Sequence, residues 1–263
     1  MKYALLDRGD RLSRALSEEF HSLAKAKGFQ VDDQSPEIVV SIGGDGTLLQ
    51  AFHRFEDQLE QVSFIGIHTG HLGFYADWKK DELSELLHLM ATSEPRKVQY
   101  PLLHVEITSR EGKSKYLALN EFTLKSVDST LVSAVHINDE PFEMFRGDGI
   151  VISTPTGSTG YNKSLGGAVI HPSLEALQIA EIASINNRIY RTLGSSVILP
   201  KHHHCDIVPN LDDELFIGID HQVLQMSGVT SITCKVADCK ITFARHRPFP
   251  FWNRVREAFI GSV

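Results

Sequence analysis

The chain contains little cysteine: only Cys205, Cys234 and Cys239 occur in 263 residues, and their irregular spacing provides no disulfide framework. Such sparse use of cysteine favours a reducing compartment. The sequence also has no uncharged apolar stretch near the ~20 residues that a membrane-spanning helix needs. The apolar run at its N-terminus breaks off too early for a secretory signal. We therefore expect a cytoplasmic protein that has no membrane partner.

The chain also has fewer basic than acidic residues. The 26 lysines and arginines are outnumbered by 33 acidic residues, which gives a net charge of −7. A chain with this balance has no broad attraction for nucleic acid or anionic lipid, so we expect neither as a partner. Hydrophobic content of 42% and charged content of 22% are those of an ordinary globular protein. Any site for phosphate must therefore be local.

A glycine-rich turn is the most informative feature that the sequence does contain. Residues 41–47 read Ser-Ile-Gly-Gly-Asp-Gly-Thr, between an apolar strand-like run and an amphipathic helix. Glycines permit positive φ and let backbone N–H groups approach a ligand closely, and a helix N-terminus attracts phosphate. Asp45 is the one acid in this turn. A carboxylate is a poor neighbour for phosphate unless it binds a metal ion or accepts a proton. The turn therefore indicates phosphoryl transfer. The alternative is an ordinary corner in which Asp45 only caps the helix.

The first hundred residues alternate between strand and helix patterns. We expect strands at 3–6, 38–42 and 64–67, and helices at 12–27, 47–55 and 81–91. Short buried strands that alternate with helices predict a parallel α/β layer. Its ligand site should lie at the carboxyl ends of the strands, where the glycine-rich turn emerges.

The pattern becomes β-rich after residue 95. Strands are expected at 102–108, 116–125, 131–138, 149–153, 197–199, 214–219 and 231–236, while residues 174–185 fit either helix or strand. This spacing is typical of an antiparallel, sandwich-like or barrel-like domain. We therefore predict an α/β domain at 1–97, an all-β domain at 98–244, and an arginine- and aromatic-rich tail at 245–263 that docks on the first domain.

Two further segments carry polar groups suited to a nucleotide. Asn120 and Glu121 stand side by side in a strand-like run, where an amide and a carboxylate can grip a ribose diol. Adjacent residues of a strand point to opposite faces, so only one of the two should face the core unless the strand ends there. The alternative is an exposed strand edge. Residues 153–167 are dense in hydroxyls and glycines and include Lys163, a composition that suits a pyrophosphate. A purely structural loop is the alternative for that run.

The histidine run His202-His203-His204 raises the question of a metal site. Consecutive strand residues cannot all face one ion, and no nearby carboxylate or cysteine spacing completes a ligand set. Cys234 and Cys239 are likewise separated by too weak a pattern for zinc. We therefore predict no metal site built from protein side chains.

Four motifs occur in the order found in one family. They are Gly43–Thr47, Asn120-Glu121, Arg146-Gly147-Asp148-Gly149 and the run from Thr154 to Tyr161. With them, nearly the whole chain resembles the bacterial type of NAD kinase. The first motif is shared with lipid kinases and, loosely, with phosphofructokinases, whereas the threonine-proline run is more specific. A lipid or diacylglycerol-type kinase and a non-catalytic nucleotide-binding regulator are the competing hypotheses.

The resemblance implies an enzyme that phosphorylates the 2′-hydroxyl of the adenosine ribose of NAD with ATP to give NADP. It implies a phosphofructokinase- and diacylglycerol-kinase-like first domain, a β-rich domain for NAD binding and oligomerisation, and a homotetramer. A divalent cation, Mg²⁺, would arrive with ATP. The phosphate donor stays open among ATP, other nucleotides and polyphosphate, as do use of NADH and feedback by NADP.

The resemblance also assigns site residues. Asp45 would be the proton acceptor. The phosphate-handling loop would contain Gly43, Gly44, Gly46 and Thr47, and the NAD ribose and nicotinamide side would be bound by Asn120 and Glu121, near Arg146 and Asp148. The adenine and ribose pocket would be lined by Ser158, Thr159, Gly160, Tyr161, Asn162, Lys163 and Ser164, with Phe74, Ala183 and His221. Gly160 departs from the family's usual alanine, which should leave the site wider and still active.

Overall fold

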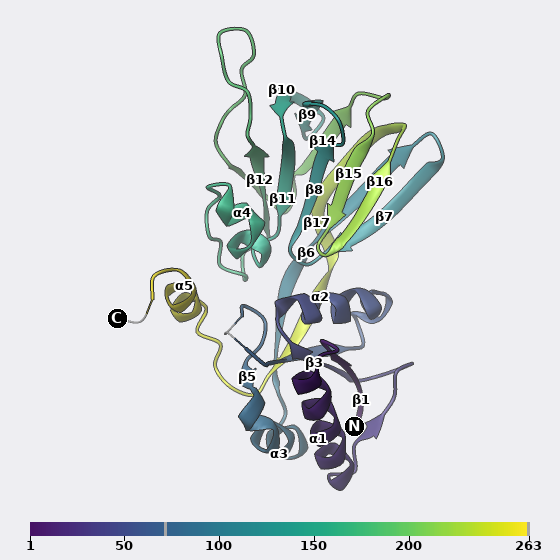
Figure 1. The fold of residues 1–263 in the computed structure, drawn as a ribbon, viewed down its shortest axis with the longest axis vertical. Coiled ribbons are helices and arrows are strands. Elements are labelled where there is room, and N and C mark those ends of the chain that lie inside the picture. Colours follow the sequence, from purple (N-terminus) through teal and green to yellow (C-terminus); the bar gives the residue numbers. More distant parts are fainter. Residues whose placement is uncertain (71–72, 262–263) are drawn as a thin grey trace. The chain divides into compact units, whose positions relative to one another are not determined.

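The computed structural model describes residues 1–70 and 73–261, which form two compact units (Figure 1). Unit 1 consists of Met1–Gln99 together with the chain from Lys240 onward, and unit 2 is Tyr100–Cys239. The C-terminal helix α5 (Phe251–Phe259) therefore belongs with the N-terminal part of the chain. None of the helices in the described part of the chain combines the length and the hydropathy of a membrane span.

Unit 1 is a parallel α/β layer, as the alternating pattern predicts. Its strands are β1 (Lys2–Asp7), β2 (Gln30–Val31), β3 (Ile38–Gly43), β4 (Ser63–His68), β5 (Trp78–Lys79) and the end of β17 (Val229–Arg245). Its remaining helices are α1 (Arg11–Ala26), α2 (Asp45–Arg54), η1 (Glu56–Gln58), η2 (Lys80–Glu82) and α3 (Leu83–Thr92). The order runs β17-β4-β3-β1-β2, β5 also pairs with β4, and all these pairs are parallel.

The core of unit 1 explains why these segments form their elements. Every residue of β3 and β4 is buried, as expected for parallel strands covered on both faces. Helix α1 starts at Asp10, whose carboxylate accepts the N–H groups of Leu12 and Ser13. Its inner face places Phe20 in the same apolar cluster as Val40 of β3. This packing fixes the carboxyl end of β3, from which the glycine-rich turn departs.

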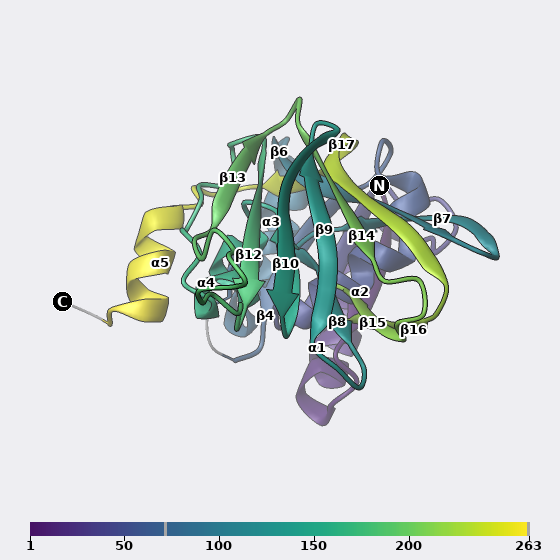
Figure 2. The ribbon, with the colours of Figure 1, turned by 90° about the horizontal axis from the view of Figure 1, so that it is seen from above.

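Unit 2 is an all-β structure with two sheets. Its strands are β6 (Arg96–Ser109, which begins in unit 1), β7 (Gly112–Ala118), β8 (Glu121–Ser126), β9 (Leu131–Ile137), β10 (Glu140–Gly147), β11 (Gly149–Ser153), β12 (Ala176–Ile182), β13 (Val197–Pro200), β14 (His204–Pro209), β15 (Leu215–Ile219), β16 (Gln222–Met226) and β17. One sheet has the order β10-β9-β14-β17, with β6 on β17 and β7 on β6 (Figure 2). The other has the order β13-β12-β11-β8-β15-β16. Short helices η3 (Gly157–Thr159) and α4 (Tyr161–Ser164) follow β11.

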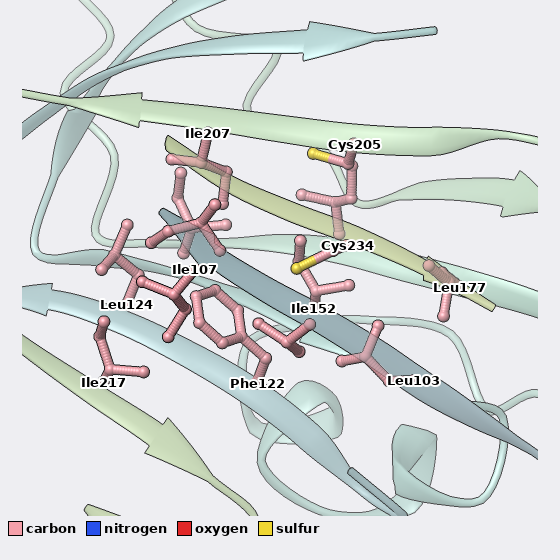
Figure 3. Packing of buried hydrophobic residues seen from close by; sticks show 14 of the residues in the cluster. Leu103, Ile107, Phe122, Leu124, Ile152, Leu177, Cys205, Ile207, Ile217 and Cys234 are labelled. Atoms are coloured by element: carbon pink, nitrogen blue, oxygen red, sulfur yellow. The ribbon is translucent and has the colours of Figure 1, made fainter. Parts of the chain in front are cut away.

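A single apolar cluster joins the two sheets of unit 2. Leu103, Ile207 and Cys234 from the first sheet lie in the same cluster as Phe122 and Ile152 from the second (Figure 3). Burial of both inner faces in one core is the arrangement of a β-sandwich. The predicted all-β, sandwich-like domain is therefore confirmed.

The strand boundaries differ from the sequence pattern at informative places. The expected strand 116–125 is interrupted at Leu119 and Asn120, where β7 ends and β8 begins. Residues 174–185, which fitted either type, contain the strand β12. Strands β10, β14 and β16 were not expected, and in β10 and β16 the apolar residues Phe142, Met144 and Val223 are exposed, which obscures the alternation of a half-buried strand. The interruption at Asn120 falls within the predicted Asn120-Glu121 motif.

Candidate active site

The glycine-rich turn connects β3 to α2 at the carboxyl end of the parallel sheet. Gly43 is required by packing, since a Cβ there would lie 2.2 Å from Oγ1 of Thr47. Gly44 and Gly46 are exposed, and a Cβ at either position would meet no atom within 4 Å. None of the three has a positive φ, so the freedom expected from sequence is not what they supply. Gly44 and Gly46 instead supply open space beside the N-terminus of α2, which suits an anionic ligand.

Asp45 is the first residue of α2, yet it does not cap that helix. Its carboxylate instead accepts the backbone N–H groups of Phe74 at 2.8 Å and Tyr75 at 3.2 Å. Burial raises the pKa of Asp45, while these two N–H groups, and more weakly the charges of Arg254 and His68, oppose the rise. The helix-cap alternative is therefore wrong. The carboxylate has a fixed orientation and an affinity for protons above its ordinary value.

The segment from Gly73 to Asp77 holds Asp45 in place. A Cβ on Gly73 would lie 2.2 Å from Oδ1 of Asp45, so only glycine allows this approach. The Phe74 ring stacks on Phe259 of α5, with 5.8 Å between ring centroids. The same backbone that binds Asp45 is thus anchored on the C-terminal helix.

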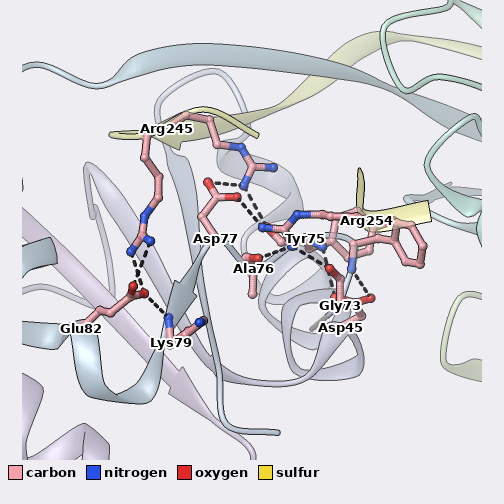
Figure 4. A network of polar contacts seen from close by, with 11 residues as sticks. Asp45, Gly73, Tyr75, Ala76, Asp77, Lys79, Glu82, Arg245 and Arg254 are labelled. Atoms are coloured by element: carbon pink, nitrogen blue, oxygen red, sulfur yellow. Dashed lines mark hydrogen bonds and ion pairs between the residues drawn. The ribbon is translucent and has the colours of Figure 1, made fainter. Parts of the chain in front are cut away.

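Two arginines from the C-terminal part of the chain fix this segment (Figure 4). Arg254 donates from Nη1 to the carbonyls of Gly73 at 2.7 Å and Ala76 at 2.5 Å, and from Nη2 to Asp77 at 3.3 Å. Arg245 donates to the Tyr75 carbonyl at 2.9 Å and pairs with the other oxygen of Asp77 at 2.5 Å. The Asp77 side chain is only 3% exposed, so this ion pair network is buried. The sequence indicated a docking tail and did not reveal what it holds.

Replacement of Arg254 by Met should therefore weaken both the fold and the site. It leaves buried Asp77 with one partner fewer, a change that costs about 3–5 kcal/mol. It also releases the carbonyls of Gly73 and Ala76. We expect a lower melting temperature and a lower kcat in the folded fraction. Arg256→Met, an exposed position on the same helix, is the control and should change neither. Equal behaviour of the two variants would contradict the anchoring role.

In unit 2, Asn120 and Glu121 lie where the strand pattern breaks. The backbone N–H groups of Leu119, Asn120 and Glu121 all donate to the carboxylate of Asp220, at 2.8, 2.7 and 3.1 Å. Asp220 itself has a positive φ of 52° in the turn between β15 and β16. No role for Asp220 is predicted from the sequence. The structure shows that Asp220 organises the break, and the only signal was an acid preceding histidine between two strands.

Glu121 has an unusual electrostatic environment. Its Oε2 is buried, with no hydrogen-bond partner in the described part of the chain. Burial, with a smaller contribution from the Asp220 carboxylate, raises the pKa of Glu121 to about 8. Glu121 is therefore mostly protonated at neutral pH, where it can donate a hydrogen bond as well as accept one.

This pKa predicts a pH-dependent stability. The ordinary pKa of 4.5 is raised to about 8 in the folded chain, so the native state holds a proton that the unfolded state has lost between these values. The contribution is fully present below pH 4.5 and disappears as pH rises through 8. Wild type and Glu121→Gln should melt at similar temperatures near pH 4, and wild type should melt progressively lower than the variant as the pH rises from 4.5 to about 8. Parallel melting curves across that range would show that Glu121 is not buried as a neutral acid.

The hydroxyl-rich run after β11 stabilises the interruption between β7 and β8 at Leu119 and Asn120. Thr154 and Thr156 both donate to the Leu119 carbonyl, at 2.6 and 2.8 Å. A Cβ on Gly157 would lie 2.0 Å from the Asn120 carbonyl oxygen. The close fit therefore couples this loop to Asn120 and Glu121.

Two of the predicted site residues in this run point inward. The hydroxyl of Ser158 donates to the Pro155 carbonyl at 2.6 Å and accepts the Ile170 N–H at 2.8 Å. Asn162 is buried, and its amide donates to the carbonyl of Ser158 at 3.3 Å. These two side chains hold the loop itself. The predicted residues that are at least partly exposed are Thr159, Gly160, Tyr161, Lys163 and Ser164.

Gly160 lies directly against Glu121. A methyl group at this position would lie 3.5 Å from Oε2 of Glu121 and 3.3 Å from the Gly157 carbonyl oxygen. Glycine at this position thus leaves a methyl-sized space beside the neutral acid.

Three of the remaining predicted residues of unit 2, Arg146, Asp148 and Ala183, lie at the ends of β10, β11 and β12. The Arg146 guanidinium lies 4.3 Å from the ring centroid of Tyr190, and the Asp148 N–H donates to the Ile182 carbonyl at 2.9 Å. Ala183 follows at φ 46°, a left-handed conformation that is strained for alanine. His221 is exposed, directly after Asp220.

The geometry thus forms three groups of residues. The first group, in unit 1, is Asp45 with Phe74 and the open turn at Gly44 and Gly46. The other two, in unit 2, are Glu121 with Asn120 and Asp220, and Arg146 with Asp148. A helix N-terminus with exposed glycines and one oriented carboxylate of raised pKa suits phosphoryl transfer. The fold and the site define a kinase-type phosphotransferase.

Comparison with known proteins agrees with this class. The ATP-NAD kinase N-terminal domain matches residues 16–94, and the ATP-NAD kinase C-terminal domain matches residues 119–222. NAD kinase 1 of Bacillus subtilis (strain 168) is 51% identical over 264 residues, covering 100% of this chain and 99% of that protein. The NAD kinase of Geobacillus stearothermophilus is 52% identical over 262 residues, covering 99% and 97%.

Two solved structures share the fold at low identity. Yeast NADH kinase, solved with NADH, superposes with a TM-score of 0.85 at 17% identity and covers 99% of this chain and 87% of that chain. An NAD kinase from Archaeoglobus fulgidus, solved with ATP, gives a TM-score of 0.76 at 21% identity and covers 96% of each. The chain belongs to the ATP-NAD kinase family. It is accordingly a transferase that uses ATP, and the lipid-kinase and regulator hypotheses lose their support.

Proposed function

We propose that this chain transfers the terminal phosphoryl group of ATP to the 2′-hydroxyl of the adenosine ribose of NAD, with Asp45 as the proton acceptor. The observation that carries the proposal is the orientation of Asp45 by the N–H groups of Phe74 and Tyr75. A base held in this way takes the hydroxyl proton as the bond to phosphorus forms. Its raised pKa brings it closer to the working pH, which favours proton transfer.

The glycine-rich turn handles phosphate in this proposal. Gly44 and Gly46 leave room for phosphate oxygens at the N-terminus of α2, whose dipole stabilises negative charge. Gly43 and Thr47 pack against each other and keep the turn rigid. Rigid positioning and charge stabilisation are the main requirements of phosphoryl transfer.

The divalent cation fits this turn as a partner of the nucleotide. Asp45 is the only carboxylate among residues 41–47, and its two oxygens already accept backbone N–H groups. We therefore propose that Mg²⁺ is held chiefly by ATP phosphates and is not caged by the protein. When bound, the ion neutralises charge on the transferred phosphoryl group.

Unit 2 supplies the dinucleotide contacts in this proposal. Asn120 and the neutral Glu121 bind ribose hydroxyls on the nicotinamide side, and Arg146 and Asp148 lie near them in the bound state. Adenine and its ribose contact Thr159, Gly160, Tyr161, Lys163 and Ser164, with Ala183 and His221, while Ser158 and Asn162 support the loop from within. The ordered break at Asn120 supports this assignment, because it presents both side chains at a strand end.

We propose that the chain acts as a homotetramer in the cytoplasm. Support for assembly comes from the segment after β12, where Ile189, Leu193 and Ile198 are 81%, 51% and 50% exposed. Exposed apolar side chains gathered in this way are typical of a subunit interface. The three cysteines, all free thiols, favour a reducing compartment.

The assembly predicts an activity that depends on concentration. Specific activity should fall as the protein is diluted towards its dissociation constant, together with the mass measured by light scattering. Ile189→Asp should shift this transition to higher concentration. Val31→Asp, at an exposed position in unit 1, should leave it unchanged. A fully active monomer at every concentration would overturn the oligomer.

The proposed reaction is tested by comparing acceptors. Purified protein with ATP and Mg²⁺ should form ADP and NADP with NAD, and should leave diacylglycerol vesicles unphosphorylated. Phosphatidate formation at a comparable rate would restore the lipid-kinase hypothesis.

A further inference from the structure

A histidine and two carboxylates converge on the β10-β9-β14-β17 sheet of unit 2. His204 and Asp206 are two residues apart on β14, so their side chains emerge on the same face, and Asp139 lies in the turn between β9 and β10. Nε2 of His204 is 3.4 Å from Oδ1 of Asp139 and 3.3 Å from Oδ2 of Asp206. The three ligand atoms lie within 4.8 Å of one another, and no other such group occurs among residues 1–70 and 73–261.

The backbone holds these three residues in register. The Asn138 N–H donates to the His204 carbonyl at 3.1 Å, and the His204 N–H donates to Oδ1 of Asn138 at 3.0 Å. This reciprocal pair fastens the β9–β10 turn to the first residue of β14. Asn138 and Asp139 both have positive φ, at 51° and 66°, as a tight two-residue hairpin turn requires. Asp139 is therefore brought to His204 by the turn itself.

Asp206 is oriented by a neighbour on the adjacent strand. The Thr233 hydroxyl donates to its Oδ1 at 2.5 Å, and the two residues are register partners across β14 and β17. Oδ2 faces His204. An outer hydrogen bond that fixes which carboxylate oxygen is presented is a recurring feature of metal sites.

The distances match the ligand spacing of a small divalent ion. With tetrahedral bonds of 2.0–2.1 Å, adjacent ligand atoms lie roughly 3.3–3.4 Å apart. The two distances from His204 Nε2 have these values. The cluster opens into a cavity of about 560 Å³, which leaves room for water as a further ligand.

Charge around the cavity also favours a cation. Among the residues that line it, Glu106 is paired with Lys113 at 2.7 Å and Lys115 at 3.6 Å. Counted together, the acids Glu106, Asp139, Asp206 and Asp238 exceed the lysines Lys113, Lys115 and Lys235 by one charge. The positive charge of Lys235 lowers the affinity of the site for a cation, but the net charge around the cavity stays negative.

We propose that Asp139, His204 and Asp206 form a binding site for a divalent transition-metal ion of the zinc class. The site does not include any residue of the proposed phosphoryl-transfer machinery and does not depend on that function. Near the histidine run the sequence shows no carboxylate spacing that would complete a ligand set. The fold completes it with one acid from the same strand and one from a hairpin turn 65 positions earlier in the chain.

Cobalt(II) tests this site directly, because a tetrahedral cobalt complex absorbs visible light. Full-length protein, freed of metal by a chelator and kept without nucleotide, should bind one equivalent of Co²⁺ per chain with that absorption, and Zn²⁺ should displace it. His204→Ala and Asp206→Asn should each weaken Zn²⁺ binding at least tenfold in a calorimetric titration. Thr233→Val should weaken it to a smaller extent.

The control lies in the same histidine run. His202→Ala should bind Zn²⁺ as wild type does, and melting curves of every variant establish that it is folded. If wild type binds no ion, or if His204→Ala binds as tightly as wild type, the site does not exist. In that case His204 only contacts the two carboxylates. Equal losses from His202→Ala and His204→Ala would likewise overturn the proposal, because they would indicate adventitious binding to the histidine run.

Discussion

Replacement of Asp45 by Asn should abolish turnover while NAD binding survives within a few-fold. The asparagine side chain keeps the shape of the native one and removes the carboxylate that accepts the hydroxyl proton. A general base contributes roughly 10²–10⁴-fold to rate, so kcat should fall by about that factor. Because the lost interaction acts on the transition state, kcat and kcat/KM should fall together. Steady-state assays and NAD titration by calorimetry measure the two quantities separately.

The control for this variant is Asp57→Asn, an exposed carboxylate in the same unit. It should retain wild-type kcat. The introduced amide can accept only one of the two N–H groups that Asp45 accepts, so a melting curve should accompany the assay. If the folded Asp45→Asn variant kept a tenth or more of wild-type kcat, the proton-acceptor role would be wrong.

Glu121→Ala should raise KM for NAD about 10–100-fold and leave KM for ATP nearly unchanged. The neutral acid is buried beside Gly160 and can exchange hydrogen bonds with a ribose hydroxyl. Leaving such a group without its partner costs about 1–3 kcal/mol. Glu121→Gln keeps the size and the donor, so its KM for NAD should lie between wild type and Ala.

Glu140→Ala provides the matched control, since Glu140 is an exposed acid of unit 2. It should alter neither KM. Equal increases in KM for NAD and ATP in Glu121→Ala would place Glu121 in a structural role. A change in kcat alone would contradict ground-state binding by this residue.

Local sequence patterns were sufficient to predict the glycine-rich turn and the strand and helix that flank it. The strand before Gly43 and the helix from Asp45 follow from an apolar run, three glycines and a helical stripe, all within about fifteen residues. These features are local, so the sequence can carry them. The break at Asn120 was not predicted, because the strand pattern runs on from 116 to 125.

The groups that hold the site come from distant parts of the chain. Asp220 lies 99 residues from Glu121, and Arg254 lies 181 residues from Gly73, so no periodicity links either pair. The hydroxyls of Thr154 and Ser158 were expected to face a ligand, but both donate to backbone carbonyls. Composition alone does not show whether a hydroxyl is already hydrogen-bonded to the backbone. Only the fold reveals these partners.

The most direct test of the central claim is the fate of the terminal phosphate of ATP. The protein is incubated with γ-labelled ATP, Mg²⁺ and NAD, and the labelled dinucleotide is isolated and examined by phosphorus NMR. We predict one labelled phosphate per ADP formed, attached to the 2′-oxygen of the adenosine ribose, and none with Asp45→Asn. Label at another hydroxyl, or ADP formation without labelled dinucleotide, would contradict the account.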